Sequence, residues 1–167
     1  SDVTIDLNGF VLQGDPADDA HGIFVAPGLQ NVSIRNGVLR EWGNDGIHAL
    51  EVENLMLESL RVHQSVQAGV RMSSGTIADV HVVDNGGPGV YMGNPVPGIG
   101  VVVKKHPNNL YSHRNGGGGV VIEGDCDIEL SGVIRENTGD GIRWSPATPT
   151  DGLRLKLDAC DSSGNTG

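Results

Sequence analysis

Histidine, arginine and tyrosine recur at one fixed offset in this 167-residue chain, directly after a Gly-Ile or Gly-Val pair. His48, Arg71 and Tyr91 each occupy this position. Arginine can bind a carboxylate through two hydrogen bonds, and histidine and tyrosine can donate or accept protons. These three residues are therefore predicted catalytic residues for an anionic substrate, if the fold places them side by side. The other residues at the same offset are Phe24, Val121 and Arg143.

A second set of basic and aromatic residues lies seven and nine positions before each repeated Ile or Val. Its members, with Arg143 from the first set, are the predicted substrate-binding residues: Arg40, Arg61, His63, His81, Tyr111, His113, Arg135 and Arg143. No Asp or Glu occupies this second set of positions, although the chain has 21 acidic and 11 Lys or Arg residues and a net charge of −10. The local positive charge predicts an acidic polymer as ligand, and protonation of histidine below about pH 6.5 should strengthen it. The alternative is that these are ordinary polar positions on exposed strands.

A repeat organises both sets of residues. The glycines that precede the repeated Ile or Val are 24, 23, 20, 30 and 22 residues apart, and their positions are Gly22, Gly46, Gly69, Gly89, Gly119 and Gly141. A period in this range indicates a solenoid. Apolar residues alternate with polar ones in runs of only three to five, which is typical of short strands. Asn85, Asn115 and Asn137 share one offset, where stacked amides can bond along a column and have a structural role.

Two segments, residues 31–47 and 134–142, resemble the right-handed parallel β-helix of the pectin-lyase-like superfamily. They are similar to the generic β-helix repeats of secreted carbohydrate-binding and sugar-hydrolysing proteins. The resemblance implies an all-β fold of about seven coils of ~24 residues. Residues 1–167 are expected to form one domain with uncapped ends, as a fragment or trimmed part of a longer protein. The resemblance also implies an extracellular or cell-surface location.

The same resemblance implies a protein that binds an acidic polysaccharide or oligosaccharide. If it is an enzyme, a lyase or C5-epimerase is expected, in which Arg71 neutralises the uronate carboxylate and His48 or Tyr91 exchanges the C5 proton. Whether it is an enzyme stays open, because polygalacturonase and mannuronan-epimerase motifs are not intact: Asn137-Thr138 is followed by Gly139, and Asp15-Pro16 by Ala17. The alternative is a structural or adhesive solenoid, such as a stalk or phage-fibre segment, without catalytic activity.

The sequence says less about partners and cofactors than about the fold. The acidic balance argues against nucleic acid as partner, and no apolar run approaches the ~18 residues of a membrane span. Homo-oligomers and end-to-end stacking both stay open.

No cofactor is required; the acids between Glu123 and Glu129 could bind Ca²⁺, or form a solvated edge. Cys126 and Cys160 are expected to be free thiols, and a Pro/Gly loop over 93–100 is expected beside Tyr91.

An acidic cluster in the first long turn has two interpretations. Asp15, Asp18, Asp19 and His21 lie close together in the sequence. Paired carboxylates can serve a glycosidase, but neighbouring aspartates are also common in polar turns. The turn interpretation is favoured.

Overall fold

The strands of this protein stack into a parallel β-solenoid of about 5 turns. The structure is a computed structural model that describes residues 2–93, 101–103, 110–124, 126–146 and 154–167. The described residues contain strands and turns but no helix, and none of them forms a segment able to span a membrane as a helix. The prediction of an all-β parallel solenoid is confirmed. About seven coils were expected, and the structure has about 5 turns.

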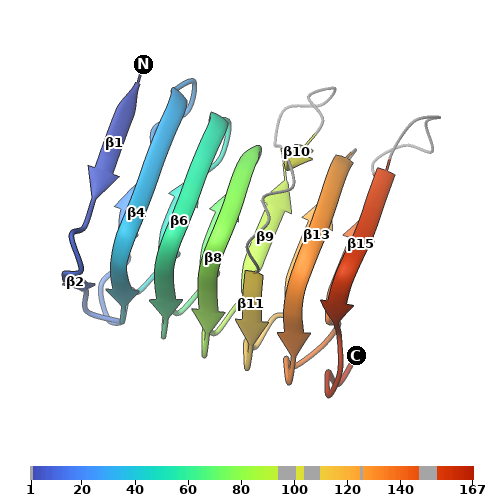
Figure 1. The fold of residues 1–167 in the computed structure, drawn as a ribbon. Helices are drawn as coiled ribbons and strands as arrows, with labels where there is room; N and C mark the ends of the chain where they lie inside the picture. Colours follow the sequence, from blue (N-terminus) through green and yellow to red (C-terminus); the bar gives the residue numbers. More distant parts are fainter. Residues whose placement is uncertain (1, 94–100, 104–109, 125, 147–153) are drawn as a thin grey trace.

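Two sheets make up the wall of the solenoid (Figure 1). The nine-stranded sheet contains β1 (Val3–Asp6), β2 (Val11–Gln13), β4 (Gln30–Arg40), β6 (Glu53–His63), β8 (Gly75–Val83), β10 (Val101–Val103), β11 (Leu110–His113), β13 (Cys126–Arg135) and β15 (Arg154–Asp161). The six-stranded sheet contains β3 (Ile23–Phe24), β5 (Ile47–Ala49), β7 (Val70–Met72), β9 (Val90–Gly93), β12 (Val120–Glu123) and β14 (Ile142–Ser145). Each strand pairs in parallel with the equivalent strand of the next coil, so residues at one repeat offset become vertical neighbours.

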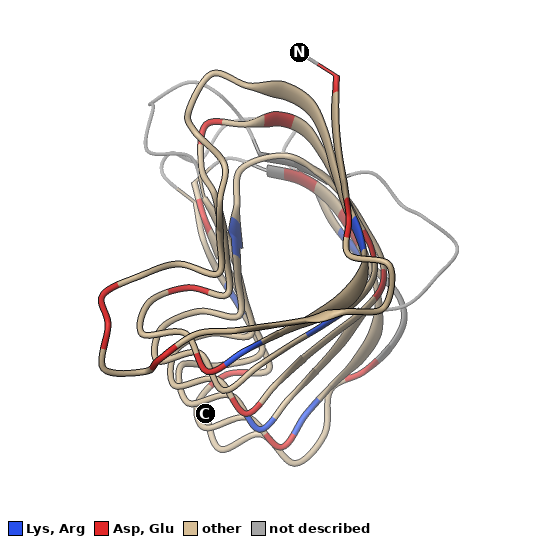
Figure 2. Cartoon of the chain, turned by 90° about the vertical axis from the view of Figure 1, so that its left-hand side faces the viewer, with Lys and Arg blue, Asp and Glu red and all other residues tan. Residues whose placement is uncertain are grey.

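A left-handed residue lies at the bend of three long strands of the nine-stranded sheet. In β4, β6 and β8 this residue is Asn36, Ser59 or Asp79, with φ between 51° and 59°. Pairing of β4 with β6 runs up to Arg35 and resumes at Gly37. Asn and Asp adopt the left-handed conformation more readily than most residues. The bend divides the long strands into two walls, and the six-stranded sheet supplies a third, so that the coils surround a common interior in the view along the stack (Figure 2).

Alternating apolar side chains fill that interior. Ile34, Leu57, Val70 and Met92 are completely buried members of one continuous hydrophobic core. Because strand side chains alternate between two faces, the residues between them face outward. The short apolar runs of the sequence therefore become one inward stripe per strand, and the polar residues between them form the outer surface.

A ladder of buried asparagines closes one corner of the coils. Asn85 donates Nδ2–H to Asn115 Oδ1 at 2.9 Å, Asn115 to Asn137 Oδ1 at 3.0 Å, and Asn137 to Asn165 Oδ1 at 3.0 Å. The same oxygens accept backbone N–H groups of the preceding coil. The predicted structural role of this column is confirmed.

Candidate functional site

The structure brings the three predicted catalytic residues together on the six-stranded sheet. His48 pairs in register with Arg71, and Arg71 pairs with Tyr91, on three consecutive strands. Phe24 precedes them in the same column. Val121 follows, but it is only 2% exposed, so the exposed row is interrupted before Arg143. We name the row Phe24, His48, Arg71 and Tyr91 the short-sheet row.

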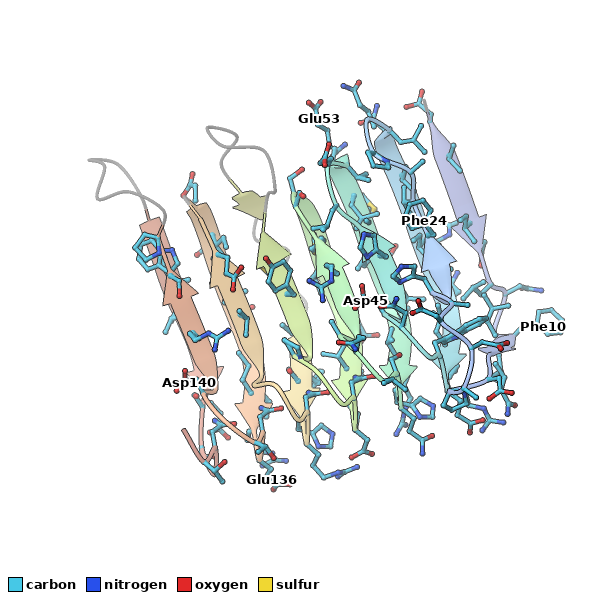
Figure 3. The ribbon with its side chains drawn as sticks, turned by 180° about the vertical axis from the view of Figure 1, so that it is seen from behind. Phe10, Phe24, Asp45, Glu53, Glu136 and Asp140 are labelled. Atoms are coloured by element: carbon cyan, nitrogen blue, oxygen red, sulfur yellow. The ribbon has the colours of Figure 1, made fainter. Side chains whose placement is uncertain are left out.

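A buried carboxylate lies at the centre of the short-sheet row. Asp45 is 1% exposed and belongs to the turn just before β5 (Figure 3). Its Oδ2 accepts hydrogen bonds from His48 Nδ1 at 2.8 Å and from Arg71 Nε at 2.9 Å. Its Oδ1 accepts the backbone N–H of Ala68 at 3.0 Å. Hydrogen bonds to ionised groups are the stronger ones, so Asp45 fixes the orientation of both side chains.

A second histidine extends this cluster into the preceding coil. The His21 Nδ1 atom is 3.3 Å from the backbone N–H of Asp45 and 3.6 Å from Asp45 Oδ2. Burial lowers the pKa of His21, and the neighbouring His48 lowers it further. The neutral ring accepts the backbone N–H through Nδ1, and its proton then resides on Nε2. The rings of His21 and His48 are 4.5 Å apart, and that of Phe24 is 5.4 Å from His48.

Tyr91 ends the exposed row with a protonated phenol. The Arg71 guanidinium lies 4.5 Å from the centre of the Tyr91 ring, and the Tyr91 hydroxyl donates to Glu123 Oε2 at 2.7 Å. Burial raises the pKa of Tyr91 to about 12, and the hydrogen bond to Glu123 acts in the same direction. The phenol is therefore neutral at pH 7, suited to donate a proton rather than to accept one.

An alkaline titration should detect this environment. In the Tyr111→Phe variant, which leaves Tyr91 as the single tyrosine, ultraviolet absorbance should report ionisation near pH 12, against about 10 for free tyrosine. Glu123→Gln should move this midpoint towards 10, because the carboxylate no longer opposes the phenolate. A midpoint at 10 in the unmodified Glu123 background would contradict the Tyr91–Glu123 hydrogen bond.

Asp45 and His21 are the important residues that the sequence did not single out as members of this cluster. The acidic first turn was expected to be an ordinary turn, and two of its aspartates fit that role. Asp15 accepts the backbone N–H of Ala17, and Asp19 accepts the amide of Asn44. His21 instead faces Asp45, which has the same offset from its Gly-Ile pair in the next coil. This shared offset is the sequence signal from which the proximity of His21 and Asp45 could have been predicted.

The predicted binding residues form two columns on the nine-stranded sheet. Arg61, His81 and Tyr111 are in register on β6, β8 and β11, with the His81 and Tyr111 rings stacked 4.4 Å apart. The second column contains, in register, Arg40, His63, Val83, His113 and Arg135. We name both columns together the basic face.

Individual residues of the basic face differ in their surroundings. Arg61 is exposed and forms no ion pair with any residue that the structure describes, whereas Arg40 donates to Gln13 at 2.8 Å. Burial and the nearby Arg114 lower the pKa of His113. His113 therefore becomes charged only at a lower pH than free histidine.

A groove of about 450 Å³ adjoins the first column at the bend of the long strands. It is lined by Gly9, Asn36, Gly37, Val38, Ser59, Leu60, Arg61, Asp79 and His81. The Asp79 carboxylate lies 3.8 Å from His81 Nε2. The Arg61 guanidinium, which has no ion-pair partner among the described residues, thus lies with the stacked ring pair and the Asp79 carboxylate beside one concave surface.

The structure does not unite the predicted catalytic and binding residues in one site. Seven of the eight predicted binding residues belong to the nine-stranded sheet, while Arg143 and all three catalytic candidates belong to the six-stranded sheet. The corner turns, such as residues 41–46, connect the two sheets. Arg143 lies 4.0 Å from Glu123 Oε1.

Two of the acids considered for Ca²⁺ have other partners. Glu123 accepts from Tyr91, and Glu129 accepts from Lys156 at 2.6 Å. Asp125, the loop 94–100 and the side chains of Cys126 and Cys160 lie outside the described residues. In the described part of the chain, one group of three side chains has converging metal-ligand atoms, and it consists of His21, Asp45 and His48.

Comparison of the chain with protein-family models, with curated proteins and with solved structures gave no significant match.

Proposed function

We propose that this β-solenoid binds an acidic polysaccharide or oligosaccharide on the basic face, as a secreted or surface member of the pectin-lyase-like superfamily. The observation that carries the proposal is the exposed Arg61 guanidinium, which has no acidic partner in the described residues and adjoins a groove of about 450 Å³. Grooves of this size are typical of small-ligand sites. The parallel solenoid and its Asn-Gly and Asp-Gly turns support the superfamily assignment.

Each group around the groove matches one feature of a uronate residue. The planar guanidinium of Arg61 binds a carboxylate through two hydrogen bonds. The stacked rings of His81 and Tyr111 offer a flat surface for a sugar ring, and Asp79 offers acceptors for hydroxyl groups. Because the columns run across successive strands about 4.8 Å apart, a chain lying along the solenoid axis meets a new side chain in every coil.

Arg61→Ala should lower the affinity for an acidic oligosaccharide at least about tenfold, since a charge-assisted pair contributes roughly 1.5–3 kcal/mol. Proton NMR line broadening across a panel of alginate, pectate and glucuronan oligomers measures the binding. Arg35→Ala is the matched control, because Arg35 is also on the outside of the nine-stranded sheet but pairs with Asp6 at 3.0 Å. Equal affinity of both variants would remove Arg61 from the site. An absence of broadening for every oligomer, with end-to-end assembly in solution, would favour the structural or adhesive solenoid instead.

A second candidate function, lyase or C5-epimerase chemistry, is supported by the hydrogen bond between His48 and Asp45. With Nδ1–H donated to Asp45, the neutral His48 ring has its lone pair on Nε2 and can accept the C5 proton of a uronate. The remaining N–H groups of Arg71 are suited to the uronate carboxylate. In a lyase, the C5–H electrons form the C4–C5 double bond, the C4–O4 bond breaks, and Tyr91 protonates the leaving oxygen. In an epimerase, Tyr91 returns a proton to C5 from the opposite side.

The same NMR experiment tests this chemistry, since unsaturated ends identify a lyase and altered ring couplings an epimerase. His48→Ala should abolish product formation, while binding at the basic face should persist because that face belongs to the other sheet. Product formation by His48→Ala would exclude His48 as the base. Binding without any product from the unmodified chain would leave a saccharide-binding protein and remove the enzymatic proposal.

A further inference from the structure

The cluster around Asp45 combines three metal-ligand atoms of two chemical kinds. One ligand atom from each of His21, Asp45 and His48 lies within 4.8 Å of the other two. The carboxylate oxygen is 2.8 Å from the His48 nitrogen and 3.6 Å from the His21 nitrogen. The three residues come from adjacent coils, at the turn before β3, the turn before β5 and β5 itself.

These separations are close to those that a transition-metal ion requires. Zn²⁺ binds imidazole nitrogen and carboxylate oxygen at about 2.0–2.2 Å, so two neighbouring ligand atoms in tetrahedral or octahedral arrangement lie roughly 2.8–3.6 Å apart. The separations of 2.8 and 3.6 Å lie at the two ends of this range. The two histidine side chains are 22% and 21% exposed, so their rings are not fully enclosed by neighbouring atoms.

We propose that His21, Asp45 and His48 bind one first-row divalent transition-metal ion of the Zn²⁺ or Co²⁺ type. Two imidazoles and one carboxylate suit these ions better than Ca²⁺ or Mg²⁺, which prefer oxygen ligands. The partial exposure of both histidines leaves room for water to complete the coordination. The metal replaces the proton that His48 Nδ1 donates to Asp45, and that proton moves to Nε2.

Groups behind the carboxylate support this site and also limit its affinity. The backbone N–H of Ala68 holds Asp45 Oδ1, and Arg71 Nε holds Oδ2. Outer hydrogen bonds of this kind orient a coordinating carboxylate. However, the Arg71 charge lies 2.9 Å from the ligand oxygen and repels a cation. Removal of this charge should therefore tighten metal binding, which an ordinary hydrogen-bonded cluster does not predict.

The site is independent of saccharide binding on the basic face, because it lies on the other sheet and needs no sugar. It competes with the proton chemistry proposed for His48, since a metal ion on Nδ1 breaks the hydrogen bond to Asp45. A metal-loaded chain should therefore keep its affinity for oligosaccharides and lose any C5 proton exchange.

Titration of the full chain with Co²⁺, followed by visible absorption and by displacement with Zn²⁺, tests the proposal. One ion per chain is expected, with affinity reduced at least about tenfold by His21→Ala or His48→Ala, as expected for loss of one ligand. Arg71→Gln should increase the affinity several-fold. His63→Ala and His81→Ala, on the basic face, are matched histidine controls and should leave the Co²⁺ affinity unchanged.

Three results would overturn the proposal. One is unchanged Co²⁺ affinity in His21→Ala and His48→Ala, and another is loss of binding in the basic-face controls. The third is an intense thiolate band, which would place the ion on Cys126 or Cys160. If circular dichroism shows that an alanine variant does not fold, the Arg71→Gln variant still tests the proposal. Co²⁺ binding by Arg71→Gln that is weaker than or equal to that of the unmodified chain contradicts the site. NMR line broadening of oligosaccharides in the absence of metal tests saccharide binding separately. Failure of the metal proposal can therefore be distinguished from failure of the saccharide proposal.

Discussion

Replacing Asn115 with alanine should lower the free energy of unfolding by about 3 kcal/mol, because buried polar partners lose their bonds. Asn115 is fully buried. The two N–H groups on its Nδ2 atom are shared among three acceptors within 3.2 Å, Val82 O, Ser112 Oγ and Asn137 Oδ1. Its Oδ1 accepts from the backbone N–H and from the side-chain amide of Asn85. Alanine offers none of these groups, and a partly satisfied buried network is worse than an apolar one.

Urea unfolding followed by circular dichroism measures this loss. Gln67→Ala is the matched control, since it also removes a side-chain amide but from an exposed position. Surface substitutions of this kind usually change stability by less than about 0.5 kcal/mol. Equal midpoints for the two variants would show that the asparagine ladder contributes nothing beyond its backbone pairing.

Asp45→Ala should destabilise the chain by about 2 kcal/mol and free the side chains of the short-sheet row. Loss of one partner from a buried ion pair costs about 3–5 kcal/mol, and the partial exposure of His48 and Arg71 reduces this value through hydration. The backbone N–H of Ala68 also loses its acceptor. Urea unfolding reports the stability, and the NMR signals of the His48 ring report its orientation.

Asp19→Ala is the matched control for Asp45, because Asp19 is exposed and, among the described residues, accepts a hydrogen bond from the side chain of Asn44 alone. It should leave both stability and the His48 signals unchanged. The double variant Asp45→Ala/Arg71→Ala should lose less than the sum of the two single variants, since both remove the same contact. Strict additivity would show that Arg71 and Asp45 do not stabilise each other.

The two outer surfaces of the solenoid divide the chemistry between them. The basic face contains Arg61 and the stacked His81–Tyr111 pair beside a groove, a composition suited to recognition. The short-sheet row contains a buried carboxylate that orients His48 and Arg71, a composition suited to proton transfer or metal binding. Each surface can be altered without touching the other, which makes the predictions above separable.

The repeat itself was sufficient to determine the fold and the in-register columns. In a parallel solenoid, residues one period apart become neighbours on adjacent strands, so counting from each Gly-Ile or Gly-Val pair placed His48 beside Arg71 and Arg71 beside Tyr91. The same reasoning placed Arg61 beside His81, and Asn85 beside Asn115. These relations depend only on strand period and coil length, which the sequence contains.

The tertiary structure decided on which sheet each column of side chains lies and which turn residues contact it. The alternation pattern assigned Val121 to the outside, yet it is buried, because burial depends on the neighbouring side chains as well as on strand direction. The predicted catalytic and binding sets lie on different sheets, since the left-handed bends and corner turns fix the angles between the walls. Asp45 and His21 lie in turns, where side-chain direction follows local backbone torsions rather than a period of two. Only the folded coils bring one ligand atom from each of His21, Asp45 and His48 within 4.8 Å of one another.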